Sequence, residues 1–169
     1  FELGVINPAP VIPDAPLYGS FPKNESRSYS GSASVLTGVM KSLNTTAVHV
    51  LDKIGFEYSF DFGKNKFGLE GLLESETTAS GKVLSDMGYS PLGLGGLTYG
   101  VTVRDMASAY ATFPNEGVYR EDRTFTKVYD SEGNLVIDNT QDSEKILSDK
   151  AVTYMNYCLR NVITGGTGT

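Results

Sequence analysis

Histidine and cysteine are nearly absent from this chain. Its 169 residues include one of each, His49 and Cys158, and no tryptophan. A single cysteine cannot form an internal disulfide, and one histidine with one cysteine cannot supply the ligands of a closed zinc site. The sequence therefore predicts no metal and no cofactor. Cys158 lies on an apolar helical stripe beside Leu159, where we expect a buried hydrophobe rather than a nucleophile.

The single histidine also restricts catalysis. A Ser-His-Asp triad could use only His49 as its base. The residues about one helical turn away, Thr45, Asp52 and Lys53, are all polar. We therefore expect His49 to lie on the solvated side of a helix, which leaves this class of mechanism close to excluded.

Long apolar runs and positive charge are scarce as well. The longest uncharged stretch, residues 87–103, is rich in Gly, Ser, Thr and Pro, whereas a membrane span needs about 20 mostly apolar residues. Lys and Arg number 14 against 20 Asp and Glu, a net charge of −6 that disfavours nucleic acid as a partner. Since the chain opens with Phe1 and closes on a glycine-rich tail, we expect a soluble piece of a longer protein.

The first third of the chain predicts an irregular segment followed by two helices. Five prolines make residues 1–31 irregular. Apolar residues at helical spacing predict one helix from about residue 32–34 and a second over 45–54, with Asn44 as its N-cap. The polar corner between these helices would place Ser42 and Asn44 side by side.

The rest of the chain predicts one strand, two further helices and a hairpin. Aromatic residues alternate over residues 56–62, which is typical of a strand, and the glycines of residues 93–100 predict tight backbone packing in a turn. Residues 124–129 and 135–137 predict a β-hairpin. Thr102 and Ser148 are expected to cap two helices.

Each of these two helices has a predicted buried face. The faces comprise Met106, Ala107, Tyr110 and Ala111 in the first helix, and Ala151, Val152, Met155, Leu159 and Val162 in the second. The fold class is therefore α+β, mostly helical with a hairpin.

Two other patterns are weak. Residues 20–23 spell S-x-x-K, the nucleophile motif of penicillin-interacting serine enzymes. That motif needs Ser and Lys on one helical face, and the surrounding prolines favour a surface turn instead. The glycines of residues 93–100 fit neither G-x-G-x-x-G nor a phosphate loop ending in G-K-[ST].

Ser42-Leu43-Asn44 has the form S-x-N, and its surroundings carry a resemblance. Residues 31–48 resemble the stretch around the S-x-N motif in the transpeptidase domain of penicillin-binding proteins, closest to the bifunctional high-molecular-weight class. Residues 94–119 resemble a later helical block of that family, and residues 146–169 resemble the segment before its K-T-G strand. These blocks keep the family's order and spacing over roughly residues 8–169.

The resemblance implies an incomplete domain. Residues 1–169 would be an internal fragment of the penicillin-binding/β-lactamase-like transpeptidase fold, lacking most of its central sheet. The S-x-x-K nucleophile would precede Phe1, and K-T-G would follow Thr169, because Gly166 stands where that motif requires Lys. We therefore expect the fragment alone to be inactive.

The resemblance also implies the chemistry. A serine attacks a D-Ala carbonyl of a peptidoglycan stem peptide, and an amine of a second stem resolves the acyl-enzyme, which β-lactam antibiotics trap. Ser42 would belong to the proton relay, and Asn44 would be both catalytic and substrate-binding by orienting the substrate amide. The parent would be membrane-anchored on the extracytoplasmic face of a bacterial cell, with a glycosyltransferase domain before Phe1.

Two other functions remain open at this point. One is a D,D-carboxypeptidase or β-lactamase-like hydrolase on the same fold. The other is a non-catalytic module that binds or scaffolds the cell wall, which the absence of S-x-x-K before Phe1 would favour.

Overall fold

The computed structural model describes all 169 residues, and helices dominate it. The helical elements are α1 (Val35–Met40), α2 (Asn44–Ile54), α3 (Phe56–Asp61), η1 (Phe62–Lys66), η2 (Tyr89–Gly93), α4 (Val103–Ala111) and α5 (Asp149–Gly165), with η1 and η2 of the π type. The strands are β1 (Val11–Asp14), β2 (Gly31–Ser34), β3 (Glu76–Thr77), β4 (Val83–Leu84), β5 (Val118–Arg120), β6 (Lys127–Tyr129), β7 (Leu135–Asp138) and β8 (Ser143–Lys145).

The strands form only small sheets. Four antiparallel pairs are present, β1–β2, β3–β4, β5–β8 and β6–β7, and none of them extends to a third strand. This is a partial α+β fold without a large central sheet, as the sequence predicts.

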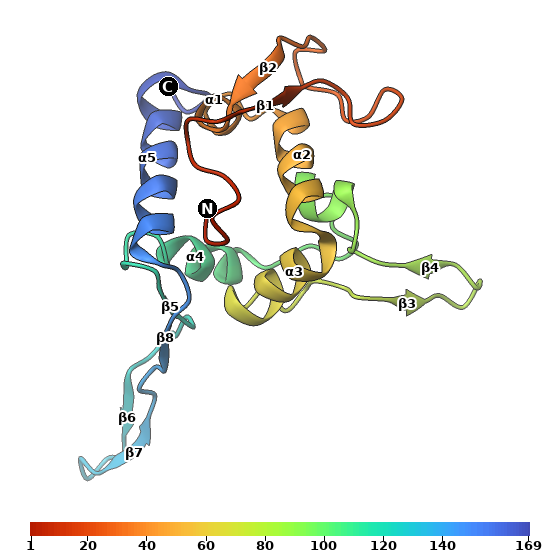
Figure 1. The fold of residues 1–169 in the computed structure, drawn as a ribbon. Coiled ribbons are helices and arrows are strands. Elements are labelled where there is room, and N and C mark those ends of the chain that lie inside the picture. Colours follow the sequence, from red (N-terminus) through yellow and green to blue (C-terminus); the bar gives the residue numbers. More distant parts are fainter.

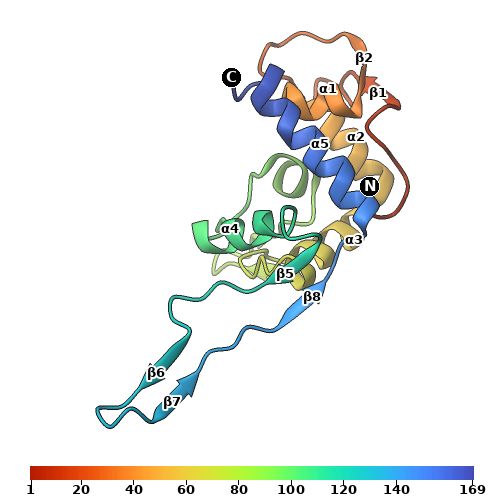
Figure 2. The same cartoon turned by 90° about the vertical axis from the view of Figure 1, so that its left-hand side faces the viewer.

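Five helices form a frame that the N-terminal segment crosses. In Figure 1, α5, α1, α2, α3 and α4 form this frame, here called the helical frame, and the first residues of the chain cross its opening. The β3–β4 hairpin projects from one corner, and the β5–β8 and β6–β7 pairs form a long arm that leaves the frame (Figure 2). No helix combines the length and the apolar composition that a membrane span requires.

The apolar core is small and lies where the arm meets the frame. Ile146, Leu147 and Val152 are buried there. The aromatic side chains that pack against them are those of Phe62, Phe67, Phe113 and Tyr119.

Residues 1–31 contain more order than the prolines predict. Residues Val11–Asp14 pair with Gly31–Ser34 in antiparallel register, and Ile12 is buried. The strand tolerates Pro13 because a two-stranded ribbon has open edges where no N–H is needed. The helix that follows begins at Val35, with the Ser34 hydroxyl accepting a hydrogen bond from the Thr37 N–H at 3.0 Å, close to the predicted start.

The predicted strand over residues 56–62 is wrong. These residues form α3 and the start of η1, and Phe60 is buried. Aromatic residues at every second position also satisfy the four-residue spacing of a helix. Tyr58 and Phe62, four residues apart, stack with ring centroids 5.6 Å apart.

The capping box of α4 is confirmed, but its predicted buried face is wrong. Thr102 and Asp105 exchange the two side-chain to backbone hydrogen bonds of the box. Ser108, Ala109 and Thr112 are the buried residues, whereas Met106, Ala107, Tyr110 and Ala111 are exposed. The small side chains of α4 are therefore buried, and its large apolar side chains are exposed.

The hairpin and the last helix are confirmed, and the tight glycine packing is confirmed in part. β6 lies within the predicted range, β7 ends one residue later than predicted, at Asp138, and α5 begins after Ser148, whose hydroxyl accepts from the Ala151 N–H. Ala151 and Val152 are buried on α5, as is Cys158, while the other predicted stripe residues are half-buried. In the glycine-rich segment a Cβ on Gly96 would lie 2.9 Å from Ser90 Oγ, whereas a Cβ on Gly95 or Gly100 would meet nothing. The Gly100 carbonyl oxygen is packed closely from the other side, since a Cβ on Gly71 would lie 2.3 Å from it.

Candidate active site

The candidate site is the corner between α1 and α2. After α1 ends at Met40, the Ser42 and Leu43 N–H groups donate to the Val39 and Gly38 carbonyls at 3.2 and 2.9 Å. Ser42 has φ of +53°, a left-handed conformation that few non-glycine residues adopt. This sharp reversal lets α2 begin at Asn44, two residues later.

A glycine sets the spacing of the two helices. A Cβ on Gly38 would lie 2.3 Å from Oγ1 of Thr46 and 2.9 Å from its Cβ. The Thr46 hydroxyl in turn donates to the Leu43 carbonyl at 2.9 Å. The missing side chain at position 38 therefore allows the first turn of α2 to pack directly against α1.

Ser42 and Asn44 line the same pocket, as the sequence predicts. The pocket has a volume of about 480 Å³ and combines these two polar residues with mostly apolar walls. Val35 and Val39 come from α1, Met155 comes from α5, and Phe1 of the N-terminal segment also lines it. The pocket thus lies between α1, α2 and α5, inside the helical frame.

Asn44 is not the N-cap of α2, which corrects the sequence prediction. Leu43 occupies the cap position, and Asn44 is the first residue of the helix. Its side-chain Nδ2 donates to the main-chain carbonyl of Lys23 at 2.8 Å. Because a carbonyl can only accept, this bond fixes which end of the amide faces Lys23 and leaves Oδ1 available to a ligand.

A buried polar network lies directly behind Asn44. Asp14 Oδ1 accepts hydrogen bonds from Thr45 Oγ1 at 2.6 Å and Asn24 Nδ2 at 2.7 Å. Asp14 Oδ2 accepts from the N–H and hydroxyl of Ser30 at 2.7 and 2.8 Å. Burial alone would raise the pKa of Asp14, but the bonds from Thr45, Ser30 and Asn24 outweigh it and lower the pKa to about 2.

Sequence reasoning missed this network. Asp14, Asn24 and Thr45 are distant in the chain, and short polar residues near prolines are equally typical of exposed turns. The one available signal was Asp14 itself, a lone acid after the uncharged residues 3–13.

His49 adds a further bond between β1 and α2, and the prediction of a solvated histidine is wrong. Its Nε2 lies 3.0 Å from the Ala15 carbonyl, and the ring is half-buried. Because the carbonyl accepts, Nε2 carries the proton in this contact. His49 follows Thr45 by one helical turn, so both residues attach the end of β1 to the same side of α2.

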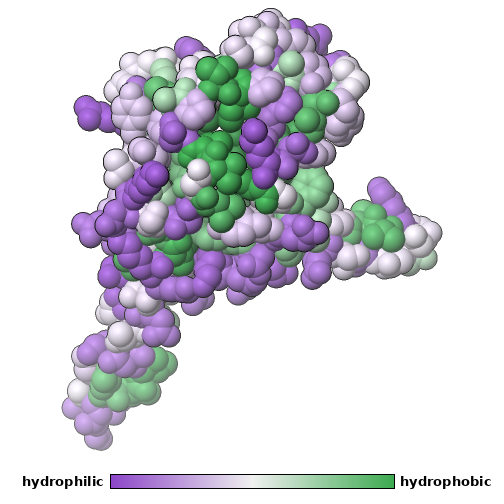
Figure 3. Space-filling view, viewed as in Figure 1, coloured by the Kyte–Doolittle hydropathy of each residue, from purple (hydrophilic) through white to green (hydrophobic).

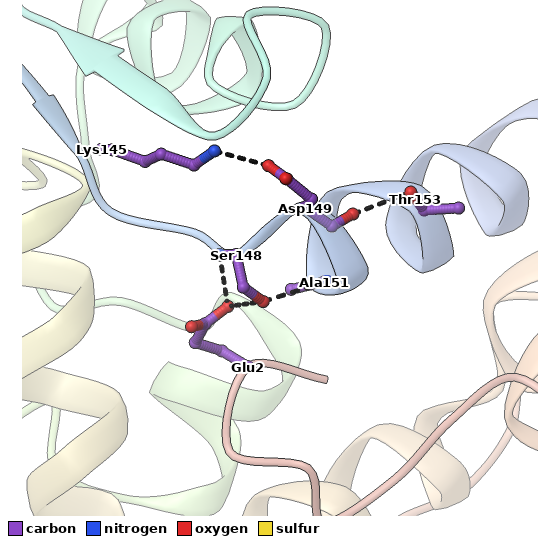
Figure 4. A network of polar contacts seen from close by, with 6 residues as sticks. All are labelled: Glu2, Lys145, Ser148, Asp149, Ala151 and Thr153. Atoms are coloured by element: carbon purple, nitrogen blue, oxygen red, sulfur yellow. Dashed lines mark hydrogen bonds and ion pairs between the residues drawn. The ribbon is translucent and has the colours of Figure 1, made fainter.

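The N-terminal segment is held at the start of α5. Figure 4 shows Glu2 reaching Ser148, whose N–H and hydroxyl both donate to Glu2 Oε2 at 2.8 Å. A carboxylate there also complements the positive end of the helix dipole. In the same view Lys145 pairs with Asp149. These contacts keep Phe1 against the pocket that Ser42 and Asn44 line.

The C-terminal tail lies against the same corner. The Thr167 N–H donates to the Met40 carbonyl at 3.0 Å, and Lys41 Nζ donates to the Gly165 carbonyl at 3.3 Å. A Cβ on Gly166 would lie 2.5 Å from the Met40 carbonyl oxygen. Glycine at this position therefore allows the tail to pass directly beside the residues that precede Ser42.

The other nucleophile candidates do not form a site. Ser20 and Lys23 lie in an exposed turn next to the Tyr18–Phe21 bridge, as expected, and not on a helix. Cys158 is fully buried on α5, and burial raises the pKa of its thiol, which opposes thiolate formation.

Solved structures share this arrangement. The D,D-transpeptidase domain of a peptidoglycan glycosyltransferase from Eggerthella lenta matches with a TM-score of 0.71 at 17% identity, covering 99% of this chain and 46% of that one. Penicillin binding protein 3 from Mycobacterium tuberculosis, complexed with aztreonam, matches with a TM-score of 0.75 at 21% identity, covering 99% and 41%. The fold is therefore that of penicillin-binding transpeptidase domains.

Sequence comparison agrees. The family described as the penicillin binding protein transpeptidase domain matches residues 1–169. Penicillin-binding protein 1A of Clostridium acetobutylicum is 31% identical over 172 residues, covering 98% of this chain and 20% of that protein. Penicillin-binding protein 1A of Clostridium perfringens is 31% identical over 179 residues, covering 98% and 25%.

The chain belongs to the penicillin-binding protein transpeptidase domain family, as the resemblance of its S-x-N region indicates. It spans about a fifth to a quarter of the length of these curated relatives.

Proposed function

We propose that residues 1–169 are an internal part of a peptidoglycan D,D-transpeptidase that works through an acyl-serine intermediate and is inhibited by β-lactams. Family membership over the whole chain supports this function. So does the partial coverage of the penicillin-binding proteins 1A, which leaves room in those relatives for the other catalytic motifs. The bifunctional class and a membrane-anchored location outside the cytoplasm belong to the same proposal.

One observation carries the assignment of the site. Ser42 and Asn44 both line the pocket inside the helical frame, although neither belongs to the apolar core. In the proposed site Asn44 orients the amide of the acylating peptide, and the Ser42 hydroxyl takes part in proton transfer to and from the nucleophile.

The proposed reaction exchanges one acyl bond for another. A nucleophilic serine outside residues 1–169 attacks the penultimate D-Ala carbonyl, forms an ester and releases terminal D-Ala as an amine that takes up the serine proton. The amine of a second stem peptide then attacks the ester, forms the cross-linking amide and returns a proton to serine. A β-lactam forms the same ester by opening its ring.

The contacts of both chain ends support where the missing motifs would join. Phe1 lines the pocket of Ser42 and Asn44, so a preceding S-x-x-K segment would approach these residues. The tail at Gly166 and Thr167 contacts the end of α1, so a following K-T-G strand would start beside the same corner. We accordingly propose that residues 1–169 alone are inactive.

Substitution of the two polar residues tests the site. In the full-length protein, Ser42→Ala and Asn44→Ala should each slow acylation by a fluorescent penicillin on the order of 100-fold, because each removes a group acting at the reacting centre. Ser131→Ala is the matched control, since Ser131 is an exposed serine in the distant hairpin turn, and it should acylate at the wild-type rate.

The same proteins distinguish the other functions. Wild-type rates in both Ser42→Ala and Asn44→Ala would contradict the site. A full-length protein that releases D-Ala from a stem peptide without cross-linking a second stem would be a carboxypeptidase or hydrolase, and one that no penicillin acylates would be a non-catalytic module.

A further inference from the structure

The first turn of α2 is attached to the rest of the molecule by polar groups that do not face the pocket. Thr45 is fully buried, and its hydroxyl lies 2.6 Å from Asp14 Oδ1 and 3.2 Å from Asn24 Oδ1. Its main-chain N–H also donates to Asn24 Oδ1 at 3.2 Å. Thr45 therefore holds both members of a buried pair that come from β1 and the loop after it.

The buried pair of Asp14 and Asn24 is also connected to the Asn44 side chain, through the main chain of Lys23. Asn24 follows Lys23, whose carbonyl accepts the Asn44 Nδ2 hydrogen bond at 2.8 Å. Asn24 is itself fixed, because its Nδ2 donates to Asp14 and to the Ser28 carbonyl. The position of the Lys23 carbonyl, and with it the orientation of the Asn44 amide, therefore depends on how Asp14 and Thr45 hold Asn24.

We propose that Thr45, together with the buried Asp14 and Asn24, is a positioning residue that orients the Asn44 side chain for the substrate amide. The three residues do not line the pocket of Ser42 and Asn44, so they act through Asn44 and do not touch the substrate. This inference rests on the proposed transpeptidase function and adds to it the residues that set the geometry of S-x-N.

The burial of this hydrogen-bond network makes the position of Asn44 sensitive to each of its members. All buried side-chain polar atoms of the chain have hydrogen-bond partners, and in such a network the loss of one group shifts the others because none can turn to water. A small displacement of a group that orients the reacting amide is costly in rate, since a misplacement of about 1 Å can cost about 100-fold.

The test measures acylation of the full-length protein by a fluorescent penicillin, both at saturation and as a function of concentration. Thr45→Val keeps the shape of the side chain and removes its hydroxyl. It should lower the saturating acylation rate about 10- to 100-fold and leave the apparent penicillin affinity within about twofold, because binding contacts remain while orientation is lost. Thr45→Ser restores the hydroxyl and should restore most of the rate.

Ser30→Ala is the matched structural control. It removes a hydroxyl bond from the same Asp14 carboxylate, on the oxygen that contacts neither Thr45 nor Asn24. It should lower thermal stability about as much as Thr45→Val while acylating within about twofold of wild type. If circular dichroism shows that Thr45→Val does not fold, Thr45→Ala is used in its place. Thr45→Ala removes the same hydroxyl, and alanine favours a helix.

A double-mutant cycle separates positioning from general stability. In an Asn44→Ala background, Thr45→Val should change the acylation rate by less than about twofold, because its effect passes through Asn44. The inference is overturned if Thr45→Val lowers the acylation rate by the same factor in both backgrounds, or if Ser30→Ala lowers that rate as much as Thr45→Val does. A wild-type protein that no penicillin acylates would instead contradict the proposed function, and the two failures are thereby distinguished.

Discussion

At the scale of single residues, Asp14 combines near-complete burial with four hydrogen bonds to its two oxygens. Donors that favour the charged form outweigh burial, and the pKa falls from its ordinary value of 3.8 to about 2. The ionised carboxylate is therefore part of the folded structure at any physiological pH.

This pKa gives a pH prediction with a definite sign. A carboxyl whose pKa is lower in the folded state contributes stability above its ordinary pKa and loses it as the pH falls through the folded value. Asp14 should contribute about 2 kcal/mol above pH 4, lost between about pH 4 and pH 2. Thermal unfolding of wild type and Asp14→Asn should therefore show a stability difference that narrows over this range. A difference that stays constant down to pH 2 would contradict the assignment.

Other residues show what sequence alone could supply. Ser42 and Asn44 could be predicted to share a pocket, because they are two residues apart in a short turn between two helices. The contacts of His49 with Ala15 and of Thr45 with Asp14 could not be predicted, because they depend on how residues 11–31 fold back over α2. Helical neighbours predict which side of a helix is polar, but not that a strand covers it.

At the scale of elements, the junction of α1 and α2 depends on a close contact. Alanine normally favours a helix over glycine by about 1 kcal/mol, so Gly38 is unfavourable for α1 by itself. The glycine is needed here because Thr46 occupies the space that a Cβ would fill.

Substitution at this contact should therefore be destabilising. Gly38→Ala should lower the thermal stability of the full-length protein by about 1–3 kcal/mol, the usual cost of overpacking, because the new methyl would overlap the Thr46 side chain. Gly165→Ala is the control, since a Cβ there would make only an ordinary 3.6 Å contact with Met40. Equal melting temperatures for Gly38→Ala and wild type would contradict the packing argument.

Elements also differ in how far their sequence determines them. The capping signals of α4 and α5 are local, and both helices begin where Thr102 and Ser148 predict. Local sequence does not decide whether residues 56–62 form a strand or a helix, because aromatic residues at every second position fit a strand and also form pairs four residues apart in a helix. Tertiary contacts decide it, as Phe56 packs edge-on against Tyr89 of η2 at 4.8 Å.

At the scale of the whole molecule, the surface is larger than the mass requires. The 169 residues expose 10228 Å², whereas a compact monomer of 18.2 kDa is expected to expose about 8100 Å². Figure 3 shows apolar side chains inside the helical frame and on both projecting hairpins. The outward face of α4 adds Val103, Met106 and Tyr110. The excess of total surface, together with these exposed apolar side chains, fits the proposal that further segments of the transpeptidase domain pack against these residues.

The central claim is that residues 1–169 supply the S-x-N wall of a transpeptidase site whose nucleophile lies elsewhere in the protein. Intact-mass spectrometry and peptide mapping after incubation with benzylpenicillin test it most directly. The full-length protein should gain the mass of one penicillin on a serine outside residues 1–169, and residues 1–169 expressed alone should gain none. A stable adduct on Ser20 or Ser42, or no adduct on the full-length protein, would contradict the account.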